Sequence, residues 1–107
     1  MNPSIAELHV GDDPIAWERV GFRVENDRCL IGTTEVVFRE GQPGIHSWAL
    51  RNARPSEFGP IPTSFVESPT PSPAPAHPNR SIGFHHVVLM APEFERGRSA
   101  LTDAGVV

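Results

Sequence analysis

Two adjacent histidines are the residues of this sequence best suited to metal or substrate chemistry. His85 and His86 interrupt an apolar, strand-like run over residues 83–90. Because successive side chains of a strand point to opposite faces, only one of the two can face a shared cavity. A neutral imidazole is a good ligand for Zn²⁺, Fe²⁺ or Mn²⁺, and two histidines with one carboxylate would suit a dioxygenase. The alternative is that His86 is a hydrogen-bonded residue of a sheet and that His85 packs under a helix or meets solvent.

A second candidate group lies near the N-terminus. Glu7 and His9 alternate with apolar residues in the predicted strand Ser4–Val10. A period of two places both side chains on one face, together with Ile5. We interpret His9 as a residue of a binding cavity, to which Glu7 would add a carboxylate. The alternative is that His9 is only a polar residue of the cavity lining.

The third candidate group is an imidazole and an indole two residues apart. His46 and Trp48 lie in the predicted strand Ile45–Arg51, so their side chains share one face. Both are candidates to line the cavity, although Trp48 is interpreted more readily as a core anchor than as a stacking platform. Cys29 is interpreted as a small buried hydrophobe. The sequence has no glycine-rich phosphate loop, no Cys-x-x-Cys pair and no Gly-x-Ser-x-Gly motif.

Composition narrows the classes of partner. The 107 residues suffice for one small domain. Nine basic residues against 13 acidic ones give a net charge of −4, so we expect no nucleic-acid partner. No apolar run approaches the roughly 20 residues that a membrane span needs, and the first residues do not form a signal peptide. A single cysteine excludes an internal disulfide and fits a reducing cytoplasm, where we expect the protein to act.

The first 52 residues predict one strand, one short helix and three or four antiparallel strands joined by short loops. Asp13 suits the N-cap of the helix, with Asp12 beside it, and Pro14 suits its first position. The helix is expected over residues 15–20, stabilised by the packing of its apolar side chains Ile15, Trp17 and Val20, and Gly21 is its expected C-terminal cap. The strands are expected over Ser4–Val10, 21–25, Arg28–Ile31, 34–40 and Ile45–Arg51.

Residues 53–80 are predicted to be a proline-rich linker. Eight prolines fall between Pro55 and Pro78. Such a stretch favours extended polyproline II structure and cannot join the interior of a sheet, so we expect it to lie across the surface or to be partly disordered. The functional alternative is a proline-rich ligand for an aromatic groove on a partner.

The remaining residues, 81–107, repeat the order of the N-terminal elements. A strand is predicted over residues 82–90, a helix over Phe94–Ala104 with Gly105 as its cap, and a new strand at Val106–Val107. Strand, acidic turn, helix, glycine and strand thus occur twice, which predicts an α+β fold of two βαβββ units, the second of them incomplete. We therefore expect the chain to be a fragment of a longer protein, or to complete its fold as a homodimer.

The run Gly83-Phe84-His85-His86-Val87-Val88-Leu89, with the acidic turn, the helix and Ala104-Gly105, resembles the opening of a vicinal oxygen chelate module. This superfamily contains glyoxalases, bleomycin-resistance proteins and extradiol dioxygenases. The first unit, through the run Gly44-Ile45-His46-Ser47-Trp48, resembles a divergent copy. The resemblance covers roughly residues 4–52 and 82–107, and it implies two modules whose sheets form a cup around a cavity.

The resemblance also implies a divalent metal, held by a histidine on the first strand and a glutamate on the last strand of each module. His86 falls on the first-strand position of the second module. The same position of the first module is occupied by Ile5, and the strand Ile45–Arg51 carries no glutamate. One of the four ligand positions is therefore filled by a residue of this chain.

Two functions follow from the resemblance as expectations. The first is a glyoxalase-like enzyme that uses Fe, Zn, Mn or Ni as a Lewis acid, namely a lyase, isomerase or dioxygenase acting on a small oxygen-chelating substrate. The alternative is a non-catalytic protein of the same fold that sequesters a small apolar or aromatic molecule. A third and weaker hypothesis is an interaction module that binds a partner through the proline-rich segment.

Overall fold

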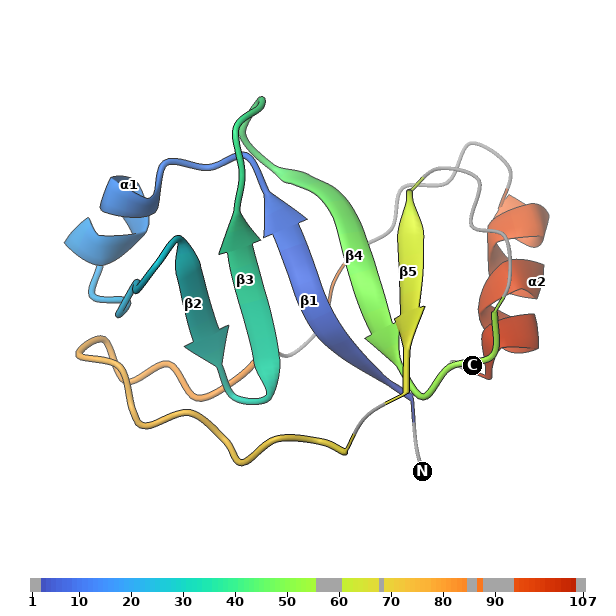
Figure 1. The fold of residues 1–107 in the computed structure, drawn as a ribbon. Helices are drawn as coiled ribbons and strands as arrows, with labels where there is room; N and C mark the ends of the chain where they lie inside the picture. Colours follow the sequence, from blue (N-terminus) through green and yellow to red (C-terminus); the bar gives the residue numbers. More distant parts are fainter. Residues whose placement is uncertain (1–2, 56–60, 68, 85–86, 88–93, 106–107) are drawn as a thin grey trace.

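A five-stranded mixed sheet with a helix near each end forms the protein in the computed structural model, which describes residues 3–55, 61–67, 69–84, 87 and 94–105 (Figure 1). A coarse α+β class fits this arrangement. The elements in chain order are β1 (Ser4–Val10), α1 (Pro14–Arg19), β2 (Arg28–Ile31), β3 (Thr34–Phe38), β4 (Ile45–Arg51), β5 (Thr63–Val66) and α2 (Phe94–Ala104).

The strands follow the order β2-β3-β1-β4-β5 across the sheet. The pairs β2–β3 and β1–β4 are antiparallel, whereas β1–β3 and β4–β5 are parallel. The antiparallel arrangement predicted for the strands after the helix is confirmed for β2–β3, but β3 and β4 do not pair, because β1 lies between them. The first strand lies between β3 and β4, because the loop joining those two crosses the end of β1. Backbone hydrogen bonds from Gly11 to Gly44 and from Arg39 to Val10 hold this crossing.

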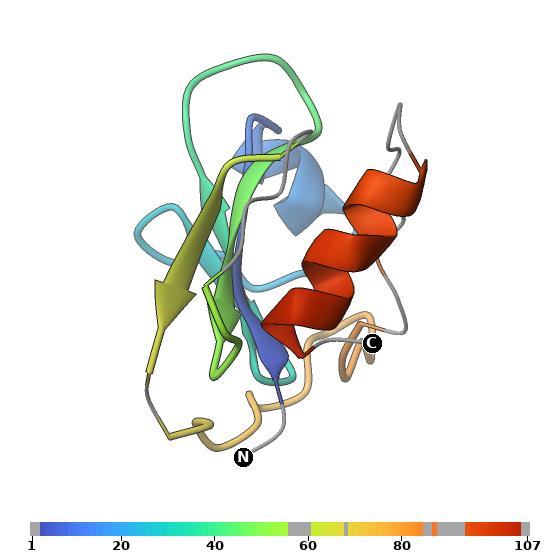
Figure 2. The ribbon, with the colours of Figure 1, turned by 90° about the vertical axis from the view of Figure 1, so that its right-hand side faces the viewer.

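One face of the sheet is apolar and carries both helices (Figure 2). It is called the helix face below. Its buried hydrophobic side chains form two clusters, the first against α2 and the second near α1. The two clusters adjoin, because Leu8 on β1 pairs with Val36 on β3. The first consists of Leu8, Trp48, Leu50, Ala100 and Ala104, and the second of Val10, Cys29, Ile31, Val36 and Phe38.

The short helix α1 depends on one side chain. Trp17 packs edge-on against Phe38 at 5.3 Å between ring centroids, and its indole nitrogen donates to Asp12 at 3.0 Å. Asp13 caps the helix by accepting from the Ile15 amide at 2.9 Å, which confirms the predicted cap. The predicted packing of Ile15 and Val20 is wrong, since they are 54% and 63% exposed. A helix of six residues presents only one narrow stripe to a sheet, and Trp17 occupies it.

The strand predicted over residues 21–25 does not form. Gly21 has a φ of +94°, and a single antiparallel bridge joins Glu25 to Arg28. Between them Asn26 and Asp27 have φ values of 52° and 57°, so the predicted turn is confirmed. The alternation of Phe22 and Val24 reflects packing against the second core cluster and not pairing with a neighbouring strand.

The proline-rich segment, residues 53–80, contributes a strand. β5 pairs in parallel with β4, so the prediction of a linker is wrong for Thr63–Val66. Its place at the edge of the sheet agrees with the prediction that the segment does not join the interior of a sheet. These four residues contain no proline and include Thr63, Phe65 and Val66, which favour a strand, and an edge position tolerates the neighbouring prolines. Residues 69–80 then run past the turn between β2 and β3 (Figure 1).

The helix α2 has the predicted bounds, and Gly105 follows it with a φ of +84° as expected. Ala100 and Ala104 are buried in the first core cluster. Arg54 caps the C-terminal end: its amide donates to the Ala104 carbonyl at 2.8 Å and its Nε to the Asp103 carbonyl at 2.8 Å. The described part of the C-terminal segment therefore packs on the sheet built by the N-terminal residues.

Residues 81–84 form no strand, although one was predicted over residues 82–90. His85, His86 and residues 88–93 lie outside the described residues, as does the predicted strand at Val106–Val107. The second βαβββ unit therefore stays a prediction. Neither of the described helices combines the length and the apolar character needed to cross a bilayer.

The buried thiol gives a first prediction. Cys29 is 1% exposed, and burial raises the pKa of its thiol. Since the thiolate is the reactive form, labelling of the native protein by a maleimide at pH 7 requires β2 to open. We expect labelling at least about 100-fold slower than in 6 M guanidinium chloride, because opening a core strand costs several kcal/mol. Mass spectrometry of time points measures both rates, and equal rates would contradict the buried position.

Candidate functional site

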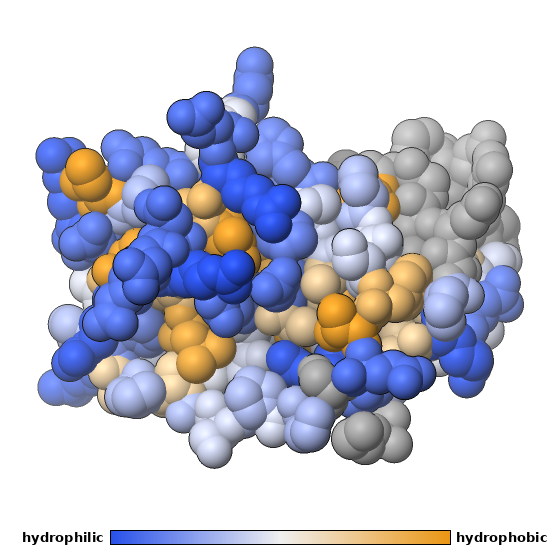
Figure 3. Space-filling model, in the orientation of Figure 1, coloured by the Kyte–Doolittle hydropathy of each residue, from blue (hydrophilic) through white to orange (hydrophobic). Residues whose placement is uncertain are grey.

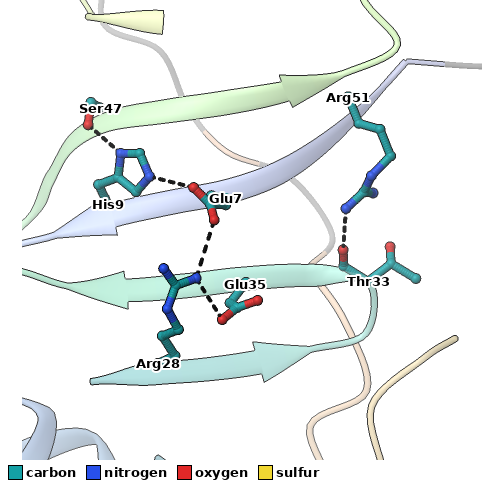
Figure 4. Close-up of polar contacts among 7 residues, drawn as sticks. All are labelled: Glu7, His9, Arg28, Thr33, Glu35, Ser47 and Arg51. Atoms are coloured by element: carbon teal, nitrogen blue, oxygen red, sulfur yellow. Dashed lines mark hydrogen bonds and ion pairs between the residues drawn. The ribbon is translucent and has the colours of Figure 1, made fainter. Parts of the chain in front are cut away.

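The face of the sheet opposite the helices carries charged and polar side chains and is called the polar face below. Figure 3 shows that it mixes hydrophilic groups with smaller hydrophobic patches. Its centre is a set of hydrogen-bonded side chains from four adjacent strands (Figure 4). This polar network consists of Glu7 and His9 on β1, Arg28 on β2, Glu35 on β3 and Ser47 on β4.

The register of the sheet brings these side chains together. His9 pairs directly with Ser47 across the β1–β4 ladder, and Glu7 pairs with Glu35 across the β1–β3 ladder. Residues directly opposite each other on one face of a sheet have neighbouring side chains, so contact follows from the pairing. Arg28 reaches the two carboxylates from β2, on the far side of β3.

A β-bulge separates Glu7 from Ile5, which were predicted to share a face. The pairing of β1 with β4 shifts between these two residues: Ile5 pairs with Leu50 and Glu7 with Ala49. The extra residue, Ala6, reverses the alternation of side chains at this point. Ile5 therefore packs against the first core cluster on the helix face, and the prediction that it shares the face of Glu7 and His9 is wrong.

His9 is the centre of the network. Its Nδ1 lies 2.6 Å from the Ser47 hydroxyl and its Nε2 lies 2.9 Å from Oε1 of Glu7. The residue is only 7% exposed, so these two contacts replace water at both ring nitrogens. The hydrogen bond from His9 is the main cause that holds the pKa of the Glu7 carboxyl below its usual range; the Arg28 charge adds to it and burial opposes it.

Arg28 links the two carboxylates. One of its terminal nitrogens lies 3.0 Å from Oε1 of Glu35 and 3.4 Å from Oε2 of Glu7. Its hydrogen bond with Glu35 raises the pKa of the guanidinium above an already high value. Glu7 and Glu35 face each other across the ladder, and like charges in that position repel unless a cation lies between them. Arg28 is that cation.

A pocket of about 460 Å³ opens beside the network, between the polar face and the proline-rich segment. Arg28, Leu30 and Glu35 come from the sheet, and Ala74, Pro75 and His77 come from the proline-rich segment. Arg23, Glu25 and Asn26 complete the lining. The pocket therefore combines charged groups of both signs with small apolar surfaces.

His77 attaches the proline-rich segment to the sheet. It is 5% exposed; its Nδ1 accepts from the Arg23 amide at 2.9 Å and its Nε2 donates to the Leu30 carbonyl at 2.7 Å. A second attachment runs from the Ala74 amide to the Gly32 carbonyl at 2.9 Å. These bonds hold the segment at the β2 side of the sheet, where the segment forms one wall of the pocket.

The other predicted site residues lie apart from the polar network. Trp48 is on the helix face, 5% exposed, and donates from its indole nitrogen to the Thr63 hydroxyl at 2.7 Å. His46 is exposed, and its Nε2 contacts the Gln42 carbonyl. His86, the predicted metal ligand, and His85 lie outside the described residues.

The described residues of the polar face do not fit a divalent metal. No group of three His, Cys, Asp or Glu side chains within the described ranges is placed to hold an ion. Both ring nitrogens of His9 already have protein partners, and the two oxygens of Glu7 contact His9 and Arg28. A guanidinium in contact with the carboxylate also opposes the approach of another cation.

Sequence reasoning found Glu7 and His9 but missed Ser47, Arg28, Glu35 and His77. In β2 and β3 the polar residues come first and an apolar run follows, a pattern that indicates neither the face of Arg28 and Glu35 nor their partner strands. Only the cross-strand register reveals that Ser47 meets His9. For His77 there was no local signal, because it stands in the proline-rich segment, where no strand or helix pattern was predicted.

Glu7 gives a second prediction, on the pH dependence of stability. Because its pKa is lowered in the folded state, ionised Glu7 stabilises the fold above its unfolded pKa of about 4.3. This contribution is lost as the pH falls through the lower folded value. In urea unfolding at pH 7 and pH 3, we expect Glu7→Gln to cost about 1 kcal/mol at pH 7 and less at pH 3.

The matched control for this prediction is Glu67→Gln, which removes an exposed carboxylate for which the described part of the chain offers no hydrogen bond. That variant should have nearly the same stability as the wild type at both pH values. An effect of Glu7→Gln that does not diminish at pH 3 would contradict the role of the ionised carboxylate.

Comparison with known proteins gives no match: the sequence fits no family model, and neither a curated protein nor a solved structure is significantly similar to it.

Proposed function

We propose that this chain is a small-molecule-binding protein of the vicinal oxygen chelate type, which sequesters a ligand in its pocket without reacting with it there, in the manner of bleomycin-resistance proteins. The observation that supports binding is the pocket of about 460 Å³ between the polar face and the proline-rich segment. Its volume lies within the range of about 300–1,000 Å³ that small-molecule sites occupy. The assignment to the superfamily rests on the sequence resemblance alone.

The lining of the pocket suggests an amphipathic ligand. Leu30, Ala74 and Pro75 offer apolar contact, while Arg28 and Glu35 offer a cation and a carboxylate. A small molecule with an apolar or aromatic body would rest on the first three residues. Its polar end would exchange hydrogen bonds with the last two. Arg28 is half exposed, so its guanidinium is accessible to such a ligand.

A thermal-shift screen of small amphipathic compounds, anionic and zwitterionic aromatic molecules among them, tests this proposal. A ligand present at 100 times its dissociation constant stabilises the native state by about 2.7 kcal/mol, which gives a shift of several degrees. Arg28→Gln should abolish the shift for the compounds that bind. Arg19→Gln, an exposed arginine at the end of α1, is the matched control and should leave the shift unchanged. Shifts that survive Arg28→Gln, or none across the panel, would contradict this site.

A metal-dependent lyase, isomerase or dioxygenase is the second candidate. It rests on the sequence resemblance alone, because the protein partners of His9 and Glu7 oppose a metal on the described polar face. The ligands, His86 among them by resemblance, would have to come from outside the described residues. Metal analysis of protein purified without chelators tests this candidate. A stoichiometric Fe, Zn, Mn or Ni ion lost on His86→Ala would support it, and a metal-free protein that chelators do not affect would contradict it.

A further inference from the structure

Ser47, His9 and Glu7 form a hydrogen-bonded relay on the polar face (Figure 4). The Ser47 hydroxyl lies 2.6 Å from Nδ1 of His9, and Nε2 of His9 lies 2.9 Å from Oε1 of Glu7. A hydroxyl, an imidazole and a carboxylate connected in this order are the parts of an activated serine nucleophile. The three residues come from two paired strands, so rigid elements position them.

The protonation of His9 follows from its partners. Glu7 is ionised at neutral pH, because the hydrogen bond from His9 and the charge of Arg28 lower the pKa of its carboxyl. An ionised carboxylate can only accept, so Nε2 of His9 carries the proton and donates it to Glu7. With this tautomer, an imidazole without a second proton turns the lone pair of Nδ1 toward Ser47. The serine hydroxyl then donates to His9, which is the direction that general-base activation requires.

The orientation of the relay is held from both sides. Arg28, itself paired with Glu35 at 3.0 Å, lies 3.4 Å from the second oxygen of Glu7 and fixes that carboxylate. His9 is buried, so water does not compete for its ring nitrogens, whereas Ser47 is partly exposed and can be reached from solvent. A buried base beside an accessible hydroxyl is the arrangement that a reacting serine needs.

We propose that Ser47 is a nucleophile, that His9 is its general base and that Glu7 is a positioning residue for His9, so that the chain transfers acyl groups from small esters. This activity goes beyond ligand binding in the pocket, because it forms and breaks covalent bonds at Ser47. Ser47 does not line the pocket.

The reaction uses no oxidant or cofactor. The Ser47 oxygen attacks the carbonyl carbon of the ester while its proton passes to Nδ1 of His9. The bond between that carbon and the alcohol oxygen breaks, and the leaving alkoxide takes the proton from His9. Water then adds to the acyl-serine with His9 again as the base, which releases the acid and restores the Ser47 hydroxyl.

A fluorophosphonate probe tests the proposal on the full chain. Its phosphorus forms a bond to an activated serine oxygen and fluoride leaves. We expect tandem mass spectrometry to locate the adduct on Ser47. Ser64 is the matched control within the same molecule. It is an exposed serine on the neighbouring strand β5, and its cross-strand partner is Ala49 and not a histidine. A wild-type protein without an adduct on Ser47, or with equal labelling of Ser64, would overturn the proposal.

The base is tested by His9→Gln, which keeps hydrogen-bonding groups but cannot accept a proton. Labelling of Ser47 should slow by about 100-fold or more, within the range that general-base catalysis contributes. An unchanged rate would mean that His9 does not act on Ser47, and the proposal would be wrong. If circular dichroism shows that this variant is unfolded, Glu7→Gln replaces it, with an expected tenfold loss of labelling and the same criterion.

The role of Glu7 has a spectroscopic signature. Nitrogen chemical shifts of the His9 ring should show a protonated Nε2 and an unprotonated Nδ1 in the wild type. In Glu7→Gln the two tautomers should mix, since no carboxylate remains to favour the proton on Nε2. A proton on Nδ1 in the wild type would overturn the proposal, because Nδ1 would then be unable to accept from Ser47. Ligand binding in the pocket is measured separately, so either proposal can fail alone.

Discussion

Replacing Trp48 with alanine is expected to reduce the free energy of unfolding by about 3–5 kcal/mol. Trp48 lies on β4 in the cluster that joins the sheet to α2, where it is 5% exposed. Its indole nitrogen also donates to the Thr63 hydroxyl, which connects β4 to the edge strand β5. The substitution removes a large buried ring, leaves a cavity between the sheet and Ala100, and leaves Thr63 without this partner. All three effects act in the same direction.

Urea unfolding followed by circular dichroism measures this loss. A domain of this size has a total stability of about 5–15 kcal/mol, so the variant should lie close to the limit of folding at 37 °C. Phe84→Ala is the matched control, because Phe84 is an aromatic residue that is 40% exposed and should cost under about 1 kcal/mol. Equal losses in the two variants would show that Trp48 is not a core residue.

Replacing His77 with alanine is expected to cost about 2–4 kcal/mol and to release the proline-rich segment from the sheet. His77 bonds two backbone groups, the Arg23 amide and the Leu30 carbonyl, and its ring lies edge-on to Phe22 at 5.5 Å. Alanine fills neither role, so both backbone groups would lose their partners in a buried position. The wall of the pocket would be lost with them.

Two measurements check this prediction. Urea unfolding gives the change in stability, and limited trypsin digestion reports release of the segment through faster cleavage after Arg80. His46→Ala is the matched control, since His46 is an exposed histidine whose ring contacts the Gln42 carbonyl, and it should change neither quantity by much. Unchanged protection of the Arg80 site in His77→Ala would contradict the role of this side chain as the attachment.

The candidate site was predictable only in part. The alternation of Ser4–Val10 correctly placed Glu7 and His9 on one face of a strand, because that relation depends on the strand alone. Their partners were not predictable. Ser47, Arg28 and Glu35 enter the network through the pairing of β1 with both β3 and β4, and an apolar–polar pattern contains no information on which strands are neighbours.

Features that depend on neighbouring residues could be predicted from the sequence, whereas features that depend on pairing between distant segments required the tertiary structure. The sequence by itself determined the start of α1, through Asp13 and Pro14, and the end of α2, through Gly105. It also determined most strand positions, because caps, turns and alternation involve residues only a few positions apart.

Tertiary structure alone decided the central place of β1, the bulge at Ala6, the entry of β5 into the sheet and the attachment by His77. Each of these depends on contacts between segments distant in sequence, whose free energies become favourable only once the sheet has formed. The Ser47–His9–Glu7 relay belongs to this second group. Its chemistry comes from residue types visible in the sequence, but its existence depends on the register between β1 and β4.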